Sequence, residues 1–461
     1  MTVTQKLVNL LGRDVVRDDA ETLAIHGRDK WFASRTPEVV VFPRTTAQVC
    51  RLLRFATRNR ITVTPRGGGV GYVGGCVPVQ GGIVLSLAEM KEIKEINPAD
   101  GVAVVQPGVI TGELQAEVRR HGLYYPPDPA SLKECTIGGN IATNAGGPRC
   151  LKYGVTRSYV LGLEVVLANG EVLRTGGRTH KNKTGFDLVG LFVGSEGLLG
   201  VVTEATLRLI PLPPARASIS ASFATFRQAA DAVQQVLGAG YLPAALEIAD
   251  SFTLESVRSY LGKSIVPEGE GHLLIDLDGQ AESVKSETKA LVSLIRGIGA
   301  LSLATAFGET DCEALWELRR QFSQSLKATG LTKLNEDIVV PRSRLVDLAE
   351  FAAHLRKKYG FPVACFGHAG DGNIHTNIMA ADYDQPEVRE KVQSALDELF
   401  AQVLAWGGAI TGEHGIGLAK RRWWPAATST VSRDVHMALK SALDSQGVLN
   451  PGKFVQAKKA T

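Results

Sequence analysis

The chain has 461 residues, of which 44% are hydrophobic and 21% charged, so it can bury a core throughout and should form two or three domains. Its 51 Lys plus Arg residues stand against 47 Asp plus Glu residues, and the two signs are interspersed, which argues against a nucleic-acid-binding protein. Apolar runs such as residues 159–168 end well short of the roughly eighteen residues that a membrane span needs. We therefore expect no membrane span.

The first residues mix acids with bases and lack the apolar core of a signal peptide, so we expect an uncleaved start and a cytoplasmic location. The six cysteines are scattered without C-x-x-C spacing, which predicts reduced thiols. An iron–sulfur cluster needs clustered thiolates, so any such centre would belong to a partner subunit.

Short β-rich runs alternate with helical patterns in the first half of the chain. Strands are predicted at residues 39–42, 61–64, 102–106, 161–167 and 199–210, and helices at 47–58 and 111–121. Pro211, Pro213 and Pro214 oppose both helix and central strand, so a first domain is expected over residues 1–213.

A second domain is predicted over residues 214–419. Strand-like runs at 218–223, 244–248, 272–277 and 301–307 enclose helices at 226–238 and 281–298. Two tandem β-α-β units suggest an antiparallel sheet with helices on one face, an architecture common in substrate-binding cap domains. Residues 420–461 are expected to be helical and to return to the first domain. The overall fold class is α+β.

A glycine-rich loop follows the second predicted strand, with Arg66 at its start and glycines at 67–69, 71, 74 and 75. It matches G-x-G-x-x-G, but a Rossmann fingerprint needs a helix to begin there, and Pro78, Gly81 and Gly82 forbid one. The loop can instead direct several backbone N–H groups at an anion such as a diphosphate. Arg66 would add positive charge.

A second glycine segment, residues 136–147, has four glycines and two asparagines in twelve residues and follows a Pro-Asp-Pro-x-Ser turn. Two tight connections on an α/β surface would be the alternative explanation, but two such loops in one domain favour close approach to a flat or charged ligand.

Both segments, together with Gly-Ser-Glu-Gly-Leu-Leu-Gly-Val-Val-Thr at 194–203, resemble the FAD domain of the vanillyl-alcohol oxidase and p-cresol methylhydroxylase superfamily. The resemblance implies a PCMH-type domain of two α+β subdomains, with Glu196 and Val202 near the adenine. Covalent members often carry His where this chain has Val70, so non-covalent FAD is expected. The implied FAD-binding residues are Arg66, Gly67, Gly68, Gly69, Val70, Gly71, Gly75, Pro127, Asp128, Ser131, Gly138, Gly139, Asn140, Thr143, Gly146, Glu196, Gly200, Val202 and Asn450.

Histidines gather in the last third of the chain. Two β-like runs around the turn residues 370–373 predict a hairpin that brings His368 and His375 side by side, with Asn377 on the face of His375. With Glu413 they make a three-ligand site with open positions, as catalytic zinc sites have. Core histidines satisfied by hydrogen bonds would be the alternative, but glycines lie close to every member in the sequence. Zinc suits these ligands, and manganese, iron and cobalt stay open.

The motifs His-x-Gly-Asp-Gly-Asn-x-His at 368–375 and Gly-Glu-His-Gly at 412–415 are similar to those of FAD-dependent D-2-hydroxyacid dehydrogenases. That group includes D-lactate dehydrogenase, D-2-hydroxyglutarate dehydrogenase and the flavin subunit of glycolate oxidase. The resemblance implies a ferredoxin-like cap and His414 as general base, with Arg319, Ser323, Lys333 and Asn377 contacting substrate. Alkyl-dihydroxyacetone-phosphate synthases share the FAD domain but not this hairpin.

The expected reaction is oxidation of a small D-2-hydroxy acid to the 2-oxo acid. The metal would lower the pKa of the substrate hydroxyl, His414 would take its proton, and hydride would pass from Cα to flavin N5. An oxygen-using flavin oxidase and a non-catalytic flavin subunit that scaffolds a redox complex are the alternatives. The electron acceptor is left open between a quinone and a protein, with an iron–sulfur subunit as one candidate. Whether the chain forms a homodimer is also left open.

The sequence Lys-Arg-Arg-Trp-Trp at 420–424 is basic and aromatic. It could dock peripherally to a membrane or to an electron-transfer partner. We favour ordinary packing of the two tryptophans.

Overall fold

The computed structural model describes residues 1–262 and 266–456, which divide into two compact units. The first unit comprises residues 1–146, 155–212 and 413 onward, and the second comprises 147–154 and 213–412. Two segments thus depart from the predicted boundaries: residues 147–154 join the second unit, and 413–419 join the first. In the latter, the Val73 carbonyl accepts hydrogen bonds from the N–H groups of Leu418 and Ala419, both in the first unit.

The first sheet of the first unit has the order β1-β2-β4-β3, antiparallel between β1 and β2 and otherwise parallel. Its strands are β1 (Val16–Arg17), β2 (Val39–Val41), β3 (Val63–Arg66) and β4 (Ile83–Ser86). Helices α1 (Val3–Leu11) and α3 (Thr46–Asn59) pack their apolar faces on this sheet in one buried cluster. Thr45 caps α3 by accepting a hydrogen bond from the N–H of Gln48, which fixes where the helix begins.

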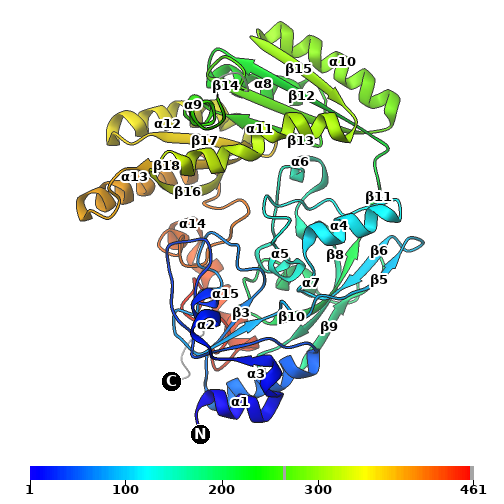
Figure 1. Cartoon of the computed structure of the whole chain (residues 1–461), viewed down its shortest axis with the longest axis vertical. Coiled ribbons are helices and arrows are strands. Elements are labelled where there is room, and N and C mark those ends of the chain that lie inside the picture. Colours follow the sequence, from blue (N-terminus) through cyan, green and yellow to red (C-terminus); the bar gives the residue numbers. More distant parts are fainter. Residues whose placement is uncertain (263–265, 457–461) are drawn as a thin grey trace. The chain divides into compact units, whose positions relative to one another are not determined.

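The second sheet is antiparallel, in the order β5-β6-β10-β8-β9 (Figure 1). Its strands are β5 (Ile93–Asn97), β6 (Val102–Val105), β8 (Val160–Val166), β9 (Val172–Gly176) and β10 (Val201–Arg208), and β7 (Leu123–Tyr124) pairs with β11 (Ile210–Pro211). Strand β10 alternates buried and half-buried positions, as a strand with one covered face does. The unit's other helices are α2 (Ala20–His26), α4 (Thr111–Arg120), α5 (Ile137–Thr143), α7 (Leu188–Phe192), α14 (Trp424–Ala427) and α15 (Thr430–Leu443).

The C-terminal residues return to the first sheet, since Leu449 bridges Val63 and the Asn450 N–H binds the Val63 carbonyl. Trp424, 9% exposed, packs against Phe454 at a ring-centroid distance of 5.2 Å. This tryptophan therefore packs in the core.

The second unit is built on a seven-stranded antiparallel sheet in the order β15-β12-β14-β13-β17-β18-β16. The strands are β12 (Ala215–Phe223), β13 (Ala245–Ala249), β14 (Gly271–Gly279), β15 (Ser302–Phe307), β16 (Thr332–Val339), β17 (Val363–His368) and β18 (Asn373–Ala380). The helices are α6 (Cys150–Tyr153), α8 (Phe226–Gly238), α9 (Ser251–Leu261), α10 (Ala281–Ile298), α11 (Glu309–Ala328), α12 (Leu345–Tyr359) and α13 (Pro386–Ala405).

Helices contact both faces of this sheet, which corrects the expectation of a single helical layer. Helices α8, α10, α12 and α13 pack against one another on one face, while α9 and α11 pack on the other against Ala249, Ala364, Phe366 and Met379. The strands β13, β17 and β18 are buried at every position, as strands covered by helices on both faces are. Among the described residues, no helix has the length and apolarity to span a membrane.

Candidate active site

The predicted hairpin is formed by β17 and β18. Their register pairs Phe366 with His375, and the alternation of side chains puts His368 on the same face. The two imidazoles are 4% and 8% exposed, and their ring centroids lie 5.5 Å apart. Gly372 makes the turn possible with a φ of +83°, and a Cβ there would lie 2.1 Å from the Val340 carbonyl oxygen.

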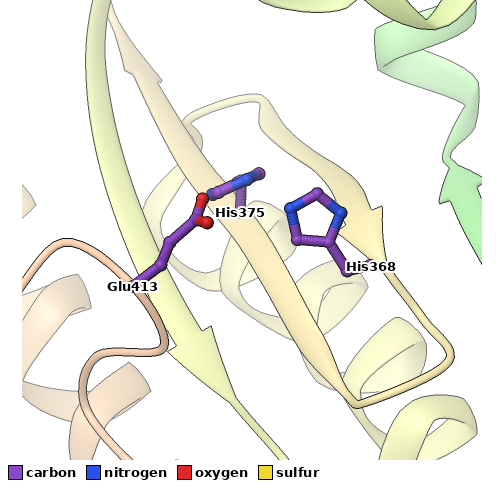
Figure 2. Close-up of side chains that lie close together, drawn as sticks. All are labelled: His368, His375 and Glu413. Carbon is purple, nitrogen blue, oxygen red and sulfur yellow. The ribbon is translucent and has the colours of Figure 1, made fainter. Parts of the chain in front are cut away.

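His368, His375 and Glu413 offer ligand atoms that all lie within 4.8 Å of one another. Figure 2 shows the Glu413 carboxylate pointing toward His375, with His368 beside it. Glu413 directly follows Gly412, the last residue of the second unit. Two nitrogens and one oxygen at this spacing suit a divalent metal with positions left open.

Glu247 on β13 orients the first of these ligands. Its carboxylate lies 2.6 Å from Nδ1 of His368 and 2.6 Å from Nε of Arg319, and its side chain is 1% exposed. Burial acts to raise the pKa of Glu247, but His368 and Arg319 outweigh it and hold that pKa at about 2. The carboxylate therefore stays ionised and can fix His368 with Nε2 as the ligand atom, the arrangement common in metal-binding histidines.

Asp337 on β16 holds the segment that leads to Glu413. This buried carboxylate accepts hydrogen bonds from Asn373 Nδ2 at 2.6 Å, from the Thr411 hydroxyl at 2.9 Å and from the Gly412 N–H at 2.9 Å. It lies opposite His375 across the β16–β18 pairing. Asp337 thus connects the residues that directly precede Glu413 with Asn373 of the hairpin.

Glu196, which the resemblance places near the adenine, also supports a neighbouring loop. Its buried carboxylate accepts hydrogen bonds from the N–H groups of Ile416 at 2.7 Å and Gly417 at 2.9 Å, and its φ is +50°. Burial raises the pKa of Glu196, while these backbone donors and Lys453 act to lower it. Glu196 therefore anchors the loop that begins with Glu413 and His414.

The predicted cationic substrate contacts lie on the α11 face of the sheet. Arg319 and Lys333 stand over the ring of Phe366 at 5.1 Å and 5.7 Å, and Lys333 Nζ donates to Ser323 Oγ at 2.8 Å. Burial, with Lys327 and Arg319 nearby, lowers the pKa of Lys333 to about 7. The predicted pair is therefore brought together, with Arg319 also bound to Glu247.

Asn377 and His414 are also placed as candidates. Asn377 is fully buried and donates to the carbonyls of Ala364 and His375, while its Oδ1 has no hydrogen-bond partner among the described residues. The His414 side chain is 14% exposed, and its ring lies 5.4 Å from that of Tyr72 in the first glycine loop. Both therefore have limited access to water.

The first glycine loop runs from β3 to β4 without a helix, as its prolines and glycines predict. Arg66, expected to supply charge to a diphosphate, instead turns inward and donates to the Arg28 carbonyl at 2.6 Å. A Cβ on Gly69 would lie 1.9 Å from that guanidinium, so the glycine packs directly on it. Arg66 supports the loop from within the protein.

The second glycine segment is partly helical, which corrects the expectation of a continuous loop. Thr136 caps α5 by accepting from the N–H of Gly139, and Asn140 Nδ2 donates to Thr111 Oγ1 at 2.7 Å. A Cβ on Gly67 would lie 2.5 Å from Thr136 Oγ1. The two glycine-rich segments therefore lie against each other within the first unit.

Two family models match the chain. Residues 212–454 match the C-terminal domain of FAD linked oxidases, and residues 37–176 match an FAD binding domain. The chain belongs to the FAD-linked oxidases. It is an FAD-linked oxidoreductase, and the two matches cover both glycine-rich segments and the hairpin.

Similar curated proteins span nearly the whole of this oxidase. It is 40% identical to the glycolate oxidase subunit GlcD of Bacillus subtilis, covering 91% of this chain and 89% of that protein. It is 33% identical to a D-lactate dehydrogenase of Anaerostipes hadrus, covering 96% and 94%.

Solved structures establish the PCMH-type fold. The p-cresol methylhydroxylase structure with bound substrate aligns with a TM-score of 0.80 at 21% identity, covering 98% of this chain and 96% of that one. An alkyldihydroxyacetonephosphate synthase aligns with a TM-score of 0.76 at 20% identity, covering 97% and 84%. At these identities the likeness concerns the fold alone.

Sequence reasoning missed the carboxylates that organise the site. Glu247, Asp337 and the anchoring role of Glu196 emerge only from pairings between distant segments. A signal did exist for Glu247, a single acidic residue inside the apolar strand Ala245–Ala249. A buried charge in such a strand requires a partner.

Proposed function

We propose that this FAD-linked oxidase converts a small D-2-hydroxy acid, of the lactate, glycolate or 2-hydroxyglutarate type, to the corresponding 2-oxo acid with the aid of a divalent metal. The observation that carries the proposal is the cluster of His368, His375 and Glu413, together with two half-buried cations, Arg319 and Lys333, over the ring of Phe366 on the sheet face of the two histidines. The names of the similar proteins, a glycolate oxidase subunit and a D-lactate dehydrogenase, support the same substrate class.

His368, His375 and Glu413 would hold the metal, with zinc the favoured ion. Bound metal supplies a Lewis acid for the substrate hydroxyl, and bound FAD supplies the acceptor of the hydride from Cα. Glu247 orients His368 and Asp337 fixes the approach to Glu413, so two of the three ligands are supported from behind.

His414 would accept the proton of the substrate hydroxyl. It adjoins Glu413 in the chain, and the nearest imidazole nitrogen to carboxylate oxygen distance between them is 3.8 Å. Glu196 holds the following residues, so the loop presents the imidazole from a fixed backbone. A base fixed near the reacting hydroxyl typically raises the reaction rate 10²–10⁴-fold.

Arg319 and Lys333 would bind the substrate carboxylate, with Ser323 and Asn377 beside them. The guanidinium offers a planar fork and the ammonium a point charge. Glu247 neutralises part of the Arg319 charge, so Lys333 would be the more responsive contact.

The flavin would be bound without a covalent link, because Val70 stands where covalent relatives carry a histidine. Acid precipitation tests this directly: the flavin should stay in the supernatant. Flavin in the protein pellet would overturn the expectation.

Anaerobic addition of glycolate, D-lactate, L-lactate, D-2-hydroxyglutarate and D-malate tests the proposed function. At least one glycolate-like or D-configured acid should bleach the flavin absorption of the metal-loaded protein. A protein that holds FAD and metal yet is bleached by none of these acids would contradict the proposal. Bleaching by L-lactate alone would contradict the stereochemistry.

A further inference from the structure

A short segment of the chain, residues 147–154, interrupts the first unit along the sequence. The chain leaves the first unit after Gly146, packs within the second unit over Gly147–Gly154, and returns at Val155. We call Gly147–Gly154 the strap. It starts at the last glycine of the second glycine segment and contains α6. It is therefore covalently continuous with one functional segment while packing in the other unit.

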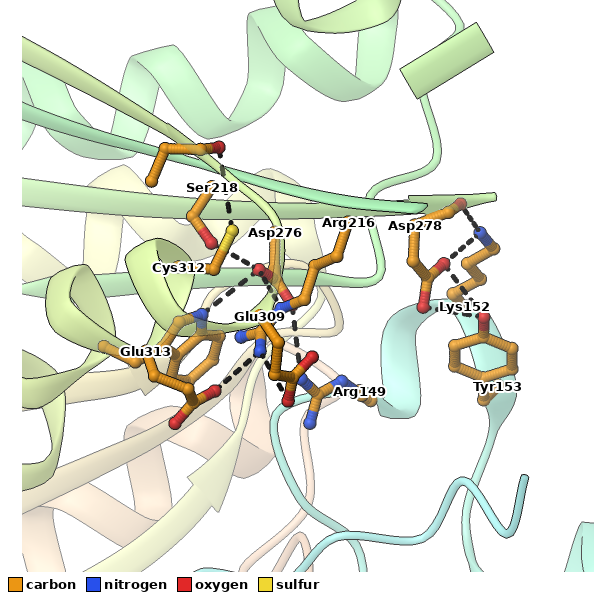
Figure 3. A network of polar contacts seen from close by, with 12 residues as sticks. Arg149, Lys152, Tyr153, Arg216, Ser218, Asp276, Asp278, Glu309, Cys312 and Glu313 are labelled. Carbon is orange, nitrogen blue, oxygen red and sulfur yellow. Dashed lines mark hydrogen bonds and ion pairs between the residues drawn. The ribbon is translucent and has the colours of Figure 1, made fainter. Parts of the chain in front are cut away.

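Two carboxylates on β14 hold the strap (Figure 3). Asp278 accepts hydrogen bonds from Lys152 and from the Tyr153 hydroxyl, the latter at 2.8 Å to Oδ2, and Lys152 also donates to the Asp278 carbonyl at 2.7 Å. Asp276 pairs with Arg149 at 3.3 Å. The side chains of Asp276 and Asp278 are 1% and 9% exposed, so water competes little for these contacts.

Asp276 is also fixed from several other directions. It accepts from Arg216 Nε at 3.0 Å, from Ser218 Oγ at 2.6 Å and from Trp316 Nε1 at 3.2 Å. These donors come from β12 and α11, on the same sheet face as the proposed metal site. Arg149 thus meets a rigid acceptor, and removing Arg149 would leave the Asp276 charge with other partners.

The strap touches the turn of the metal hairpin. A Cβ built on Gly370, which lies between His368 and His375, would be 2.4 Å from Leu151 Cδ2 and 3.1 Å from Leu151 Cγ. The Gly370 N–H donates to the Leu246 carbonyl at 3.2 Å. Leu151 therefore packs on a glycine whose missing side chain is what allows the contact.

We infer that the strap couples the hairpin bearing His368 and His375 to the second glycine segment, with Arg149, Leu151, Lys152 and Tyr153 as positioning residues. The inference rests on the proposed metal role of the two histidines. A displacement of the hairpin turn passes through Leu151 to the strap, and the strap continues into the glycine segment without a break. The contacts of the strap with Asp276 and Asp278 hold it rigidly enough to transmit this displacement.

The first experiment perturbs the hairpin turn and observes the flavin. Gly370→Ala in FAD-loaded protein should weaken Zn²⁺ binding by on the order of tenfold, the effect typical of altered support behind a metal ligand, and should shift the visible flavin spectrum. Leu151→Ala alone should change both less. The double variant should regain Zn²⁺ affinity and spectrum, because the shortened side chain makes room for the new methyl group.

Two results of that experiment would overturn the inference. One is a Gly370→Ala protein that loses Zn²⁺ affinity while its flavin spectrum stays that of the parent. The other is a double variant with no recovery, since this would mean that the methyl group acts without the strap. Neither measurement requires turnover, so a failure to oxidise hydroxy acids would refute the proposed function and leave this test intact.

A second experiment works from the other end and uses a milder change. Tyr153→Phe removes one hydroxyl and keeps the ring, and it should lower Zn²⁺ affinity and shift the flavin spectrum together. Arg157→Met is the matched control, because Arg157 lies just beyond the strap and pairs with the exposed Asp187. Equal effects of the two substitutions, or no effect of Tyr153→Phe at either site, would contradict the inference.

Discussion

The hairpin of the second unit and the glycine-rich segments of the first prepare their functional groups in opposite ways. In the hairpin, both imidazoles are buried, and an ionised carboxylate, that of Glu247, orients His368. In the glycine-rich segments side chains are absent or turned inward, as Arg66 is, and backbone N–H groups are what can meet a ligand. Substitutions in the hairpin should therefore impair the reaction while FAD stays bound. Substitutions in the glycine-rich segments should weaken the binding of FAD.

The largest effect is expected at His414. His414→Ala should leave FAD bound but slow flavin reduction by about 10²–10⁴-fold, the usual contribution of a positioned base. Stopped-flow absorption under anaerobic conditions measures it. An unchanged rate of flavin reduction would contradict the assignment of His414 as the general base.

Glu247→Gln tests whether the orienting carboxylate matters for the metal. The amide keeps the size but loses the charge that pairs with His368 and Arg319, so Zn²⁺ affinity should fall about 10–100-fold. Glu317→Gln on α11 is the control, since Glu317 pairs with the exposed Arg320. Equal Zn²⁺ affinities in the two variants would contradict the orienting role.

Lys333 should make kcat/KM fall on the alkaline side of its pH profile. Its pKa of about 7 means that the free enzyme carries an ammonium below that pH and a neutral amine above it. Because a carboxylate substrate binds the ammonium, kcat/KM should fall as pH rises through about 7. Lys333→Met should lower the plateau on the order of tenfold, the equivalent of one modest charged contact, and abolish this fall. A fall that persists in the variant would assign it to another group.

Glu196→Gln should have its main effect on stability. One of the two backbone donors, Ile416 or Gly417, would then face an amide N–H₂, which costs about 1–3 kcal/mol for a buried group. Urea unfolding measures the loss. Glu95→Gln, which breaks a pair with exposed Arg178, should shift the urea midpoint less. The reverse order would show that the 413–417 loop does not depend on Glu196.

Local patterns predicted the elements that carry the site, but not the partners of its residues. The β17–β18 hairpin followed from apolar alternation around Gly-Asp-Gly-Asn, and the clustering of its histidines with Glu413 followed from motif spacing. Glu247 lies 121 residues from His368, and a pairing across that distance depends on the order of strands in the sheet. The same holds for the strap, whose partners on β14 lie more than a hundred residues away.

The expected helix placement failed for a related reason. Helices α9 and α11 cover the face that bears Glu247 and Asp276, and Trp316 and Arg319 on α11 bind those carboxylates. A tandem β-α-β pattern predicts one helical layer and gives no sign that polar strand residues need a second. The charges on β13 and β14 were the available signal.

Flavin reduction in metal-stripped and metal-reloaded protein tests the central claim most directly. Chelation should leave the flavin spectrum of the resting protein essentially intact and abolish bleaching by the hydroxy acid that is the best substrate. Adding Zn²⁺ or another divalent ion should restore it. Full-rate bleaching of the stripped protein, with metal content verified as absent, would contradict a catalytic metal at His368, His375 and Glu413.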